Sequence, residues 1–177
     1  MKTFIALLRG INVGGHNKLP MRELVQLLES LGLANVKTYI QSGNVVFQSE
    51  RTDLPALSNE IGTAVQESHG FTPRVLLLSL ADLQTAVSQN PFPATDDQHK
   101  TLHFYFLESA PPDPDLAKLE AAKSESEQFK LIDRVFYLYA PEGIGRSKLA
   151  EKVERALGVA ATARNWRTVG KIIGMIK

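Results

Sequence analysis

The chain has 177 residues, of which 44% are hydrophobic, and this is enough for one core or for two small units. Its 20 lysines and arginines nearly balance its 19 aspartates and glutamates, so the net charge of +1 excludes a strong overall attraction to nucleic acid or to a membrane. There is no cysteine and no apolar run of membrane-spanning or signal-peptide length, which excludes thiolate chemistry and predicts a cytoplasmic protein.

The hydrophobic pattern of the first half alternates between strand and helix periods. It predicts strands and helices at residues 4–8 (strand), 21–31 (helix), 36–41 and 44–48 (strands), 54–69 (helix) and 74–78 (strand). This βαββαβ order is that of a ferredoxin-like unit, whose sheet has the first strand in the middle.

A short helix at residues 80–87 and a proline-bearing linker lead to a second set of elements in a similar order. The pattern predicts strands at 101–107, 128–132 and 135–139. It also predicts a helix capped by Asp113 or Asp115 that runs through Ala122, and a helix at 147–157. In place of a final strand it predicts a helix from about Arg164 to Ile176, packed through Trp166. We therefore expect an α/β (α+β) fold with two ferredoxin-like βαββα(β) subdomains in tandem, residues 1–90 and 91–177, the second with a C-terminal helix.

The turn between the first strand and the first helix reads GINVGGHNK. Its Gly10 and Gly15 approach the spacing of a P-loop, but His16-Asn17 stands where a P-loop has its lysine and its serine or threonine. Two interpretations remain. The turn is either a tight connection that needs glycine for positive φ, or a site where main-chain amides, Lys18 and Arg9 bind one anionic group at a helix N-terminus.

The first two strands of a split βαβ unit are parallel, so this glycine-rich turn and the following hairpin turn share one edge of the sheet. Polar side chains of the hairpin turn would add donors and acceptors there, although Ser-Gly-Asn is also ordinary hairpin chemistry. Open α/β sheets bind ligands at such strand ends. The candidate ligand-binding residues are Arg9, Gly10, Asn12, Gly14, Gly15, Lys18, Gln41, Ser42 and Asn44.

The sequence assigns no catalytic residue, no cofactor and no metal site. Ser42 lies in a hairpin rather than in a Gly-x-Ser-x-Gly elbow, and His16 is more typical of a loop hydrogen-bond donor than of an acid or base. The acidic and histidine residues of 96–103 are of metal-ligating types. On a strand, however, His99 and His103 would lie roughly 13 Å apart, too far for one ion.

The C-terminal part of the chain is basic. A glycine-containing turn, PEGIGRSK, leads into one helix, and a second helix with basic residues follows, in the outline of a helix-turn-helix. A nearly neutral total charge is unusual for a DNA-binding domain, and a basic stripe is more often a solvated face. The candidate nucleic-acid-binding or partner-binding residues are Arg146, Lys148, Arg164, Arg167 and Lys171.

Four separated segments, LRGINVGG, YIQSGNVVF, GRSKL and RNWRTV, resemble the signature stretches of a bacterial family known as domain of unknown function 1697. The resemblance spans Ala6 to Val169. It implies a two-subdomain α/β fold and names no activity.

Three hypotheses follow from these patterns. In the first, a small cytosolic protein binds a phosphate-bearing or carboxylate ligand at the glycine-rich loop and the adjacent hairpin turn. In the second, a nucleic-acid-binding or protein-interaction module acts through the basic C-terminal helix. In the third, the protein is a structural interaction protein, and the glycine-rich loop is only a turn.

Overall fold

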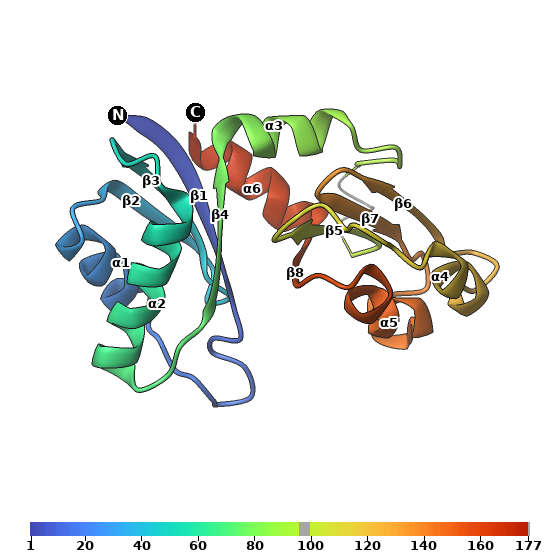
Figure 1. The fold of residues 1–177 in the computed structure, drawn as a ribbon, viewed down its shortest axis with the longest axis horizontal. Helices are drawn as coiled ribbons and strands as arrows, with labels where there is room; N and C mark the ends of the chain where they lie inside the picture. Colours follow the sequence, from blue (N-terminus) through green and yellow to red (C-terminus); the bar gives the residue numbers. More distant parts are fainter. Residues whose placement is uncertain (96–99, 177) are drawn as a thin grey trace. The chain divides into compact units, whose positions relative to one another are not determined.

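The computed structural model describes residues 1–95 and 100–176 and shows a mixed α/β fold with two four-stranded antiparallel sheets (Figure 1). The chain forms two compact units. Met1–Thr85 and Lys171–Lys177 make up the first, and Ala86–Gly170 makes up the second. The expected division at residue 90 into two subdomains stays a prediction.

The first unit has the expected order of elements: β1 (Lys2–Arg9), α1 (Met21–Ser30), β2 (Ala34–Tyr39), β3 (Asn44–Ser49), α2 (Leu54–His69) and β4 (Arg74–Ser79). Its sheet order is β2-β3-β1-β4 with every neighbouring pair antiparallel, which confirms the interior position of the first strand. Both helices lie on one face of the sheet (Figure 1). There, alternate strand residues such as Ala6 and Leu8 share a core with Leu24 and Leu57 of the helices.

The second unit repeats this order with β5 (Leu102–Leu107), α4 (Leu116–Ala122), β6 (Gln128–Ile132), β7 (Val135–Tyr139), α5 (Lys148–Leu157) and β8 (Ala161–Asn165). Its sheet order, β6-β7-β5-β8, is the same as in the first unit. Helices α4 and α5 lie together on one face (Figure 1). Their core there includes Tyr105, Leu119, Phe136 and Val153.

The final strand of this unit corrects the sequence analysis. Residues 161–165 form β8, which pairs with β5 from Ala161 opposite Leu107 to Asn165 opposite His103, and the following helix begins at Trp166 rather than at Arg164. The Asn165 side chain accepts a hydrogen bond from Thr168 N (2.9 Å), which marks the start of that helix. A short strand of alanine, threonine, arginine and asparagine carries a weak β-signal, so its pairing with β5 decides its structure.

The opposite face of the second sheet is aromatic. Phe104 makes an edge-to-face contact with Tyr137 (4.9 Å between ring centroids) and packs against Trp166 (5.8 Å), as expected for an anchoring tryptophan. The Tyr137 hydroxyl donates to Ala86 O (2.6 Å), and burial raises the pKa of this hydroxyl to about 12.

Two further helices follow the last strands of the sheets: α3 (Leu80–Ser88) comes after β4, and α6 (Trp166–Ile176) comes after β8. Each contains residues of both units, because the division falls after Thr85 and after Gly170. At the end of α6, Met175 O accepts a hydrogen bond from Lys37 Nζ of β2 (3.4 Å), which joins this helix to the first unit. None of the helices in residues 1–95 and 100–176 has both the length and the apolar character needed to cross a bilayer.

Candidate functional site

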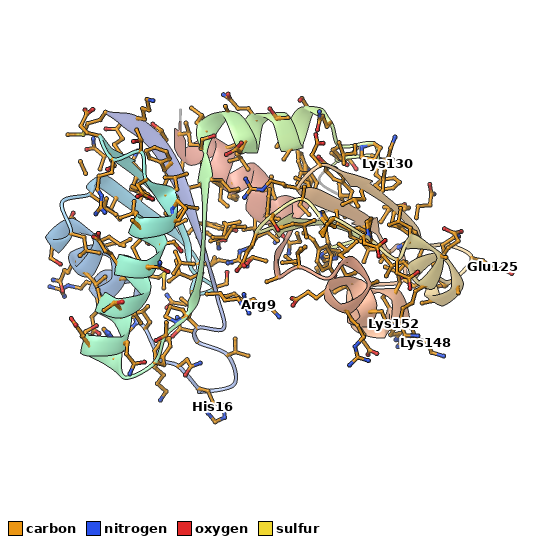
Figure 2. All side chains as sticks on the ribbon, viewed as in Figure 1. Arg9, His16, Glu125, Lys130, Lys148 and Lys152 are labelled. Carbon is orange, nitrogen blue, oxygen red and sulfur yellow. The ribbon has the colours of Figure 1, made fainter. Side chains whose placement is uncertain are left out.

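The glycine-rich loop between β1 and α1 folds as a small hairpin. Val13 and His16 form an isolated antiparallel bridge, and His16 N donates to Val13 O (2.9 Å). Between them Gly14 and Gly15 have φ values of 57° and 78°, as a type I′ turn requires. His16 lies at the tip of this loop (Figure 2). The two glycines therefore provide the positive φ that this turn requires.

Two asparagine side chains hold the base of the loop. Asn12 Nδ2 donates to Leu19 O (2.9 Å) and to Gln41 O (2.7 Å), while Asn12 Oδ1 accepts from Leu19 N (2.8 Å). Asn17 Nδ2 donates to Gly10 O (2.9 Å). Because Asn12 bonds to Gln41, the loop and the hairpin turn meet at one edge of the sheet, as the topology predicts. The amide of Asn12 is satisfied within the protein.

The hairpin turn between β2 and β3 is also stabilised internally. Asn44 is buried, and its Nδ2 donates to Tyr39 O (3.0 Å) and to Ser42 Oγ (2.9 Å). Gly43 has a φ of 86° and lies so close to Leu8 that a Cβ at this position would be 2.7 Å from the Leu8 Cβ. These side chains therefore shape the turn. Arg9, Lys18 and Gln41 are the exposed members of the predicted set with long polar side chains.

A cavity of about 460 Å³ lies in the second unit, beside the end of α4 and the start of α5. Three alanines are among its lining residues: Ala121, Ala122 and Ala140. Two glutamates, Glu127 and Glu142, also line it. Its cationic lining residues outnumber them and are Lys123, Arg146, Lys148 and Lys152.

A buried carboxylate joins the two walls of this cavity. Glu127 has a relative exposure of 5%, and its Oε1 accepts a hydrogen bond from Ser124 N (2.8 Å) just after α4. Its Oε2 accepts from the Ser147 hydroxyl, and this hydroxyl in turn accepts from Ala150 N (3.0 Å) as the N-cap of α5. Both carboxylate oxygens are thus occupied, and the first turn of α5 is tied to the end of α4.

The cations of the cavity differ in their partners. Lys123 Nζ lies 3.8 Å from Glu120 Oε1 and 3.4 Å from Glu127 O. Arg146, Lys148 and Lys152 are exposed and form no ion pair within the described part of the chain. Figure 2 shows Lys148 and Lys152 side by side on α5, one helical turn apart. Two of these unpaired cations, Lys148 and Lys152, therefore lie on the α5 wall of the cavity.

A buried tyrosine lies near the carboxylate of Glu127. Burial raises the pKa of the Tyr105 hydroxyl, and the nearby carboxylates of Glu154 and Glu127 raise it further. This tyrosine is therefore neutral at any ordinary pH. Of the two carboxylates, Glu127 is buried and Glu154 is half-buried.

The structure divides the predicted basic set. Arg146 and Lys148 line the cavity, whereas Arg164 lies on β8, where burial lowers its pKa to about 10. Arg167 and Lys171 lie on α6 and are exposed. The helix-turn-helix outline is wrong, because a strand separates α5 from α6. Arg164 accordingly does not belong to a basic stripe on the last helix.

The residues considered for metal binding include 96–99, which lie outside the described part of the chain. His103 lies within it. Its side chain is buried, with Nε2 3.1 Å from Lys100 O, and burial lowers its pKa while the Lys100 bond opposes that shift. Over residues 1–95 and 100–176, no three histidine, aspartate or glutamate side chains gather as a metal site would require.

The family model described as "Protein of unknown function (DUF1697)" matches residues 1–137. The chain belongs to this family. The match includes the LRGINVGG and YIQSGNVVF segments, while GRSKL and RNWRTV lie beyond it. No curated protein matches the chain.

A solved structure from the same comparisons supports the fold over the full chain. The conserved bacterial protein SP0830 from Streptococcus pneumoniae is 30% identical to this chain, with 99% of each chain covered and a TM-score of 0.77. The likeness therefore extends beyond residue 137 and includes the segments around the cavity.

Lys123, Glu127 and Lys152 were not predicted from the sequence. Lys152 could have been predicted, because it follows Lys148 by four residues and so shares its face of α5. Lys123 and Glu127 carried no such signal, since only the packing of α4 against α5 brings them to the same cavity.

Proposed function

We propose that this protein binds a small anionic ligand in the cavity between α4 and α5. One observation carries the proposal: Arg146, Lys148 and Lys152 line a cavity of about 460 Å³ without forming ion pairs to neighbouring carboxylates in the described chain. Cavities of this size are typical of small-molecule sites. The absence of cysteine is consistent with action in the cytoplasm.

The chemistry of the lining supports an anion. An arginine guanidinium offers paired donors that match a carboxylate or a phosphate, and lysine ammonium groups add mobile point charges. The cavity also lies at the first turn of α5, where the helix dipole favours negative charge by about 0.3–1 kcal/mol. An ordinary solvated basic face would have the same charges without the concave wall.

The proposal is tested by titrating the protein with inorganic phosphate and with acetate at constant ionic strength, following backbone amide NMR shifts. We expect saturable shifts in residues 140–148. The Arg146→Ala/Lys148→Ala variant should bind at least about tenfold more weakly, because each lost charged hydrogen bond contributes about 1.5–3 kcal/mol. Lys130 is exposed on β6 away from Lys148 (Figure 2), so Lys130→Ala is the matched control. Equal shifts in all three proteins would refute the proposal.

The edge predicted from the sequence is a second candidate anion site. Asn12 holds the glycine-rich loop and the Gln41 turn together through a 2.7 Å bond, so the backbone that carries Arg9 and Lys18 is already ordered before a ligand arrives. In the same titration, this candidate predicts shifts at residues 12–18 that Lys18→Ala abolishes without lowering the melting temperature. Unchanged wild-type amides in this loop would exclude it.

A further inference from the structure

The cavity is larger than a single phosphate or carboxylate group requires. Its volume of about 460 Å³ falls within the roughly 300–1,000 Å³ that encloses complete small molecules. Three alanines, Ala121, Ala122 and Ala140, are among the lining residues and have no polar side-chain group. A ligand that fills this cavity therefore has an organic body in addition to its anionic group.

Three of the four lining cations come from the α5 side of the cavity. Lys148 and Lys152 lie on successive turns of α5, and Arg146 lies two residues before this helix. Lys123 lies at the end of α4. Three positive charges on one wall match a dianion better than a monoanion. A phosphate monoester carries a charge of about −1.5 to −2 at pH 7 and offers three acceptor oxygens, whereas a carboxylate carries a single charge.

The two glutamates have different roles. Glu127 has both oxygens in hydrogen bonds to Ser124 N and to the Ser147 hydroxyl, so it supports the wall. Glu142 is exposed on the turn that follows β7. Its carboxylate repels a second anionic group and accepts hydrogen bonds from hydroxyl groups. The lining thus has cations at and just before the start of α5, and an acceptor four residues before Arg146 on the same turn.

We infer that the cavity binds a phosphate monoester whose organic body carries hydroxyl groups. This inference rests on the proposed function and adds the ligand class to it. The phosphate lies against Arg146, Lys148 and Lys152, and the hydroxyl-bearing body lies toward Glu142 and the three alanines.

Four probes distinguish binding of any small anion from binding of a hydroxyl-bearing phosphate monoester. They are glucose 6-phosphate, gluconate, glucose and inorganic phosphate, and their affinities are compared by isothermal titration calorimetry. We expect glucose 6-phosphate to bind at least about tenfold more tightly than gluconate or inorganic phosphate, since it supplies both the dianion and the body. If gluconate binds as tightly as glucose 6-phosphate, the inference fails and the proposed function stands. If none of the three anions binds, both fail.

Two substitutions at exposed positions then locate the ends of the ligand. Lys148→Ala should weaken glucose 6-phosphate and inorganic phosphate alike by about tenfold, through the lost charged contact. Glu142→Gln should weaken glucose 6-phosphate several-fold and leave inorganic phosphate unchanged or slightly tighter, because only the sugar has hydroxyls to donate. Lys130→Ala should change neither. A Glu142→Gln variant that binds both phosphates as the wild type does would contradict the assigned orientation and overturn the inference.

Discussion

The two units share one topology but differ in the lengths of the loops at the two ends of their sheets. In the first unit, residues 10–20 join β1 to α1 while only residues 50–53 join β3 to α2. In the second unit, residues 108–115 join β5 to α4 and residues 140–147 join β7 to α5, so the two connections are equally long. Since β1 and β3 are antiparallel, as are β5 and β7, the two connections of each unit lie at opposite ends of its sheet.

The loops also differ in what their polar groups contact. In the first unit Asn12 and Asn17 bond to the loop backbone itself, and glycine provides the positive φ of the turn. In the second unit Glu127 and Ser147 tie two helices together, and cations are left around a cavity. A glycine-rich motif can thus mark a backbone shape, while a less conspicuous set of charges marks the better candidate for binding.

The largest expected effect tests whether the glycines of the first unit are structural. Gly43→Ala should destabilise the protein by about 3–5 kcal/mol, because a Cβ there lies 2.7 Å from the Leu8 Cβ and φ is positive. Gly15→Ala has the same sign of φ but nothing within 4 Å, so it should cost about 1–2 kcal/mol. Urea unfolding followed by circular dichroism measures both. Equal losses would show that the close approach at Gly43 does not matter.

The next largest effect compares the two asparagines of the glycine-rich loop, Asn12 and Asn17. Their φ values are nearly the same, 53° for Asn12 and 52° for Asn17, so the backbone cost of alanine cancels between them. Asn12→Ala removes three side-chain hydrogen bonds and should cost about 2–3 kcal/mol more than the backbone term alone, whereas Asn17→Ala removes one and should cost about 1 kcal/mol more. Unfolding curves that rank Asn17→Ala as the more harmful would contradict the assigned role of Asn12.

The helix caps compare the two units directly. Asp53 caps α2 by accepting from Ala56 N (3.1 Å) at an exposed position, and Asp53→Ala should cost about 1 kcal/mol. Ser147 caps α5 and also donates to the buried Glu127, so Ser147→Ala should cost about 2 kcal/mol or more. Trp166, the single tryptophan, reports on the second unit by fluorescence. Matching losses for the two caps would mean that the Glu127 bond adds nothing.

The smallest expected effect is a pH dependence from the second unit. Burial lowers the pKa of His103 in the folded state, so the unfolded chain binds a proton more readily. The stability associated with this histidine is therefore present above its unfolded pKa of about 6.5 and falls as the pH decreases below that value. His103→Gln should flatten the decline in stability between pH 7 and pH 5, measured by urea unfolding of Trp166 fluorescence. A variant as acid-sensitive as the wild type would assign the decline to other groups.

Most of the fold was predictable because its elements carry strong local signals. The apolar spacing predicted the helix at residues 54–69, which the structure confirms as α2, and Asp115 is the one of the two candidate caps, Asp113 and Asp115, that begins α4. Strand β8 was missed because its residues have little intrinsic strand preference and its pairing partner, β5, lies far back in the chain. Local patterns cannot report such a contact.

The candidate site was less predictable for the same reason. The sequence predicted Arg146 and Lys148, which line the cavity. It grouped them with Arg164, which lies on strand β8 and not on a helix. The role of Glu127 depends on its burial against Ser147, twenty residues later in the chain. Only tertiary packing brings these two residues together, so the spacing of residues in the sequence could not predict their contact.

The first unit is completed by the last residues of the chain. It contains Met1–Thr85 together with Lys171–Lys177, and the whole second unit lies between them in the sequence. All the buried residues of the first unit's core, from Phe4 to Leu77, precede the second unit in the chain. This core is therefore available to fold before the second unit is synthesised, as N-terminal units generally do. Residues from Lys171 onward are the exception, because they join the first unit only after the second unit has been made.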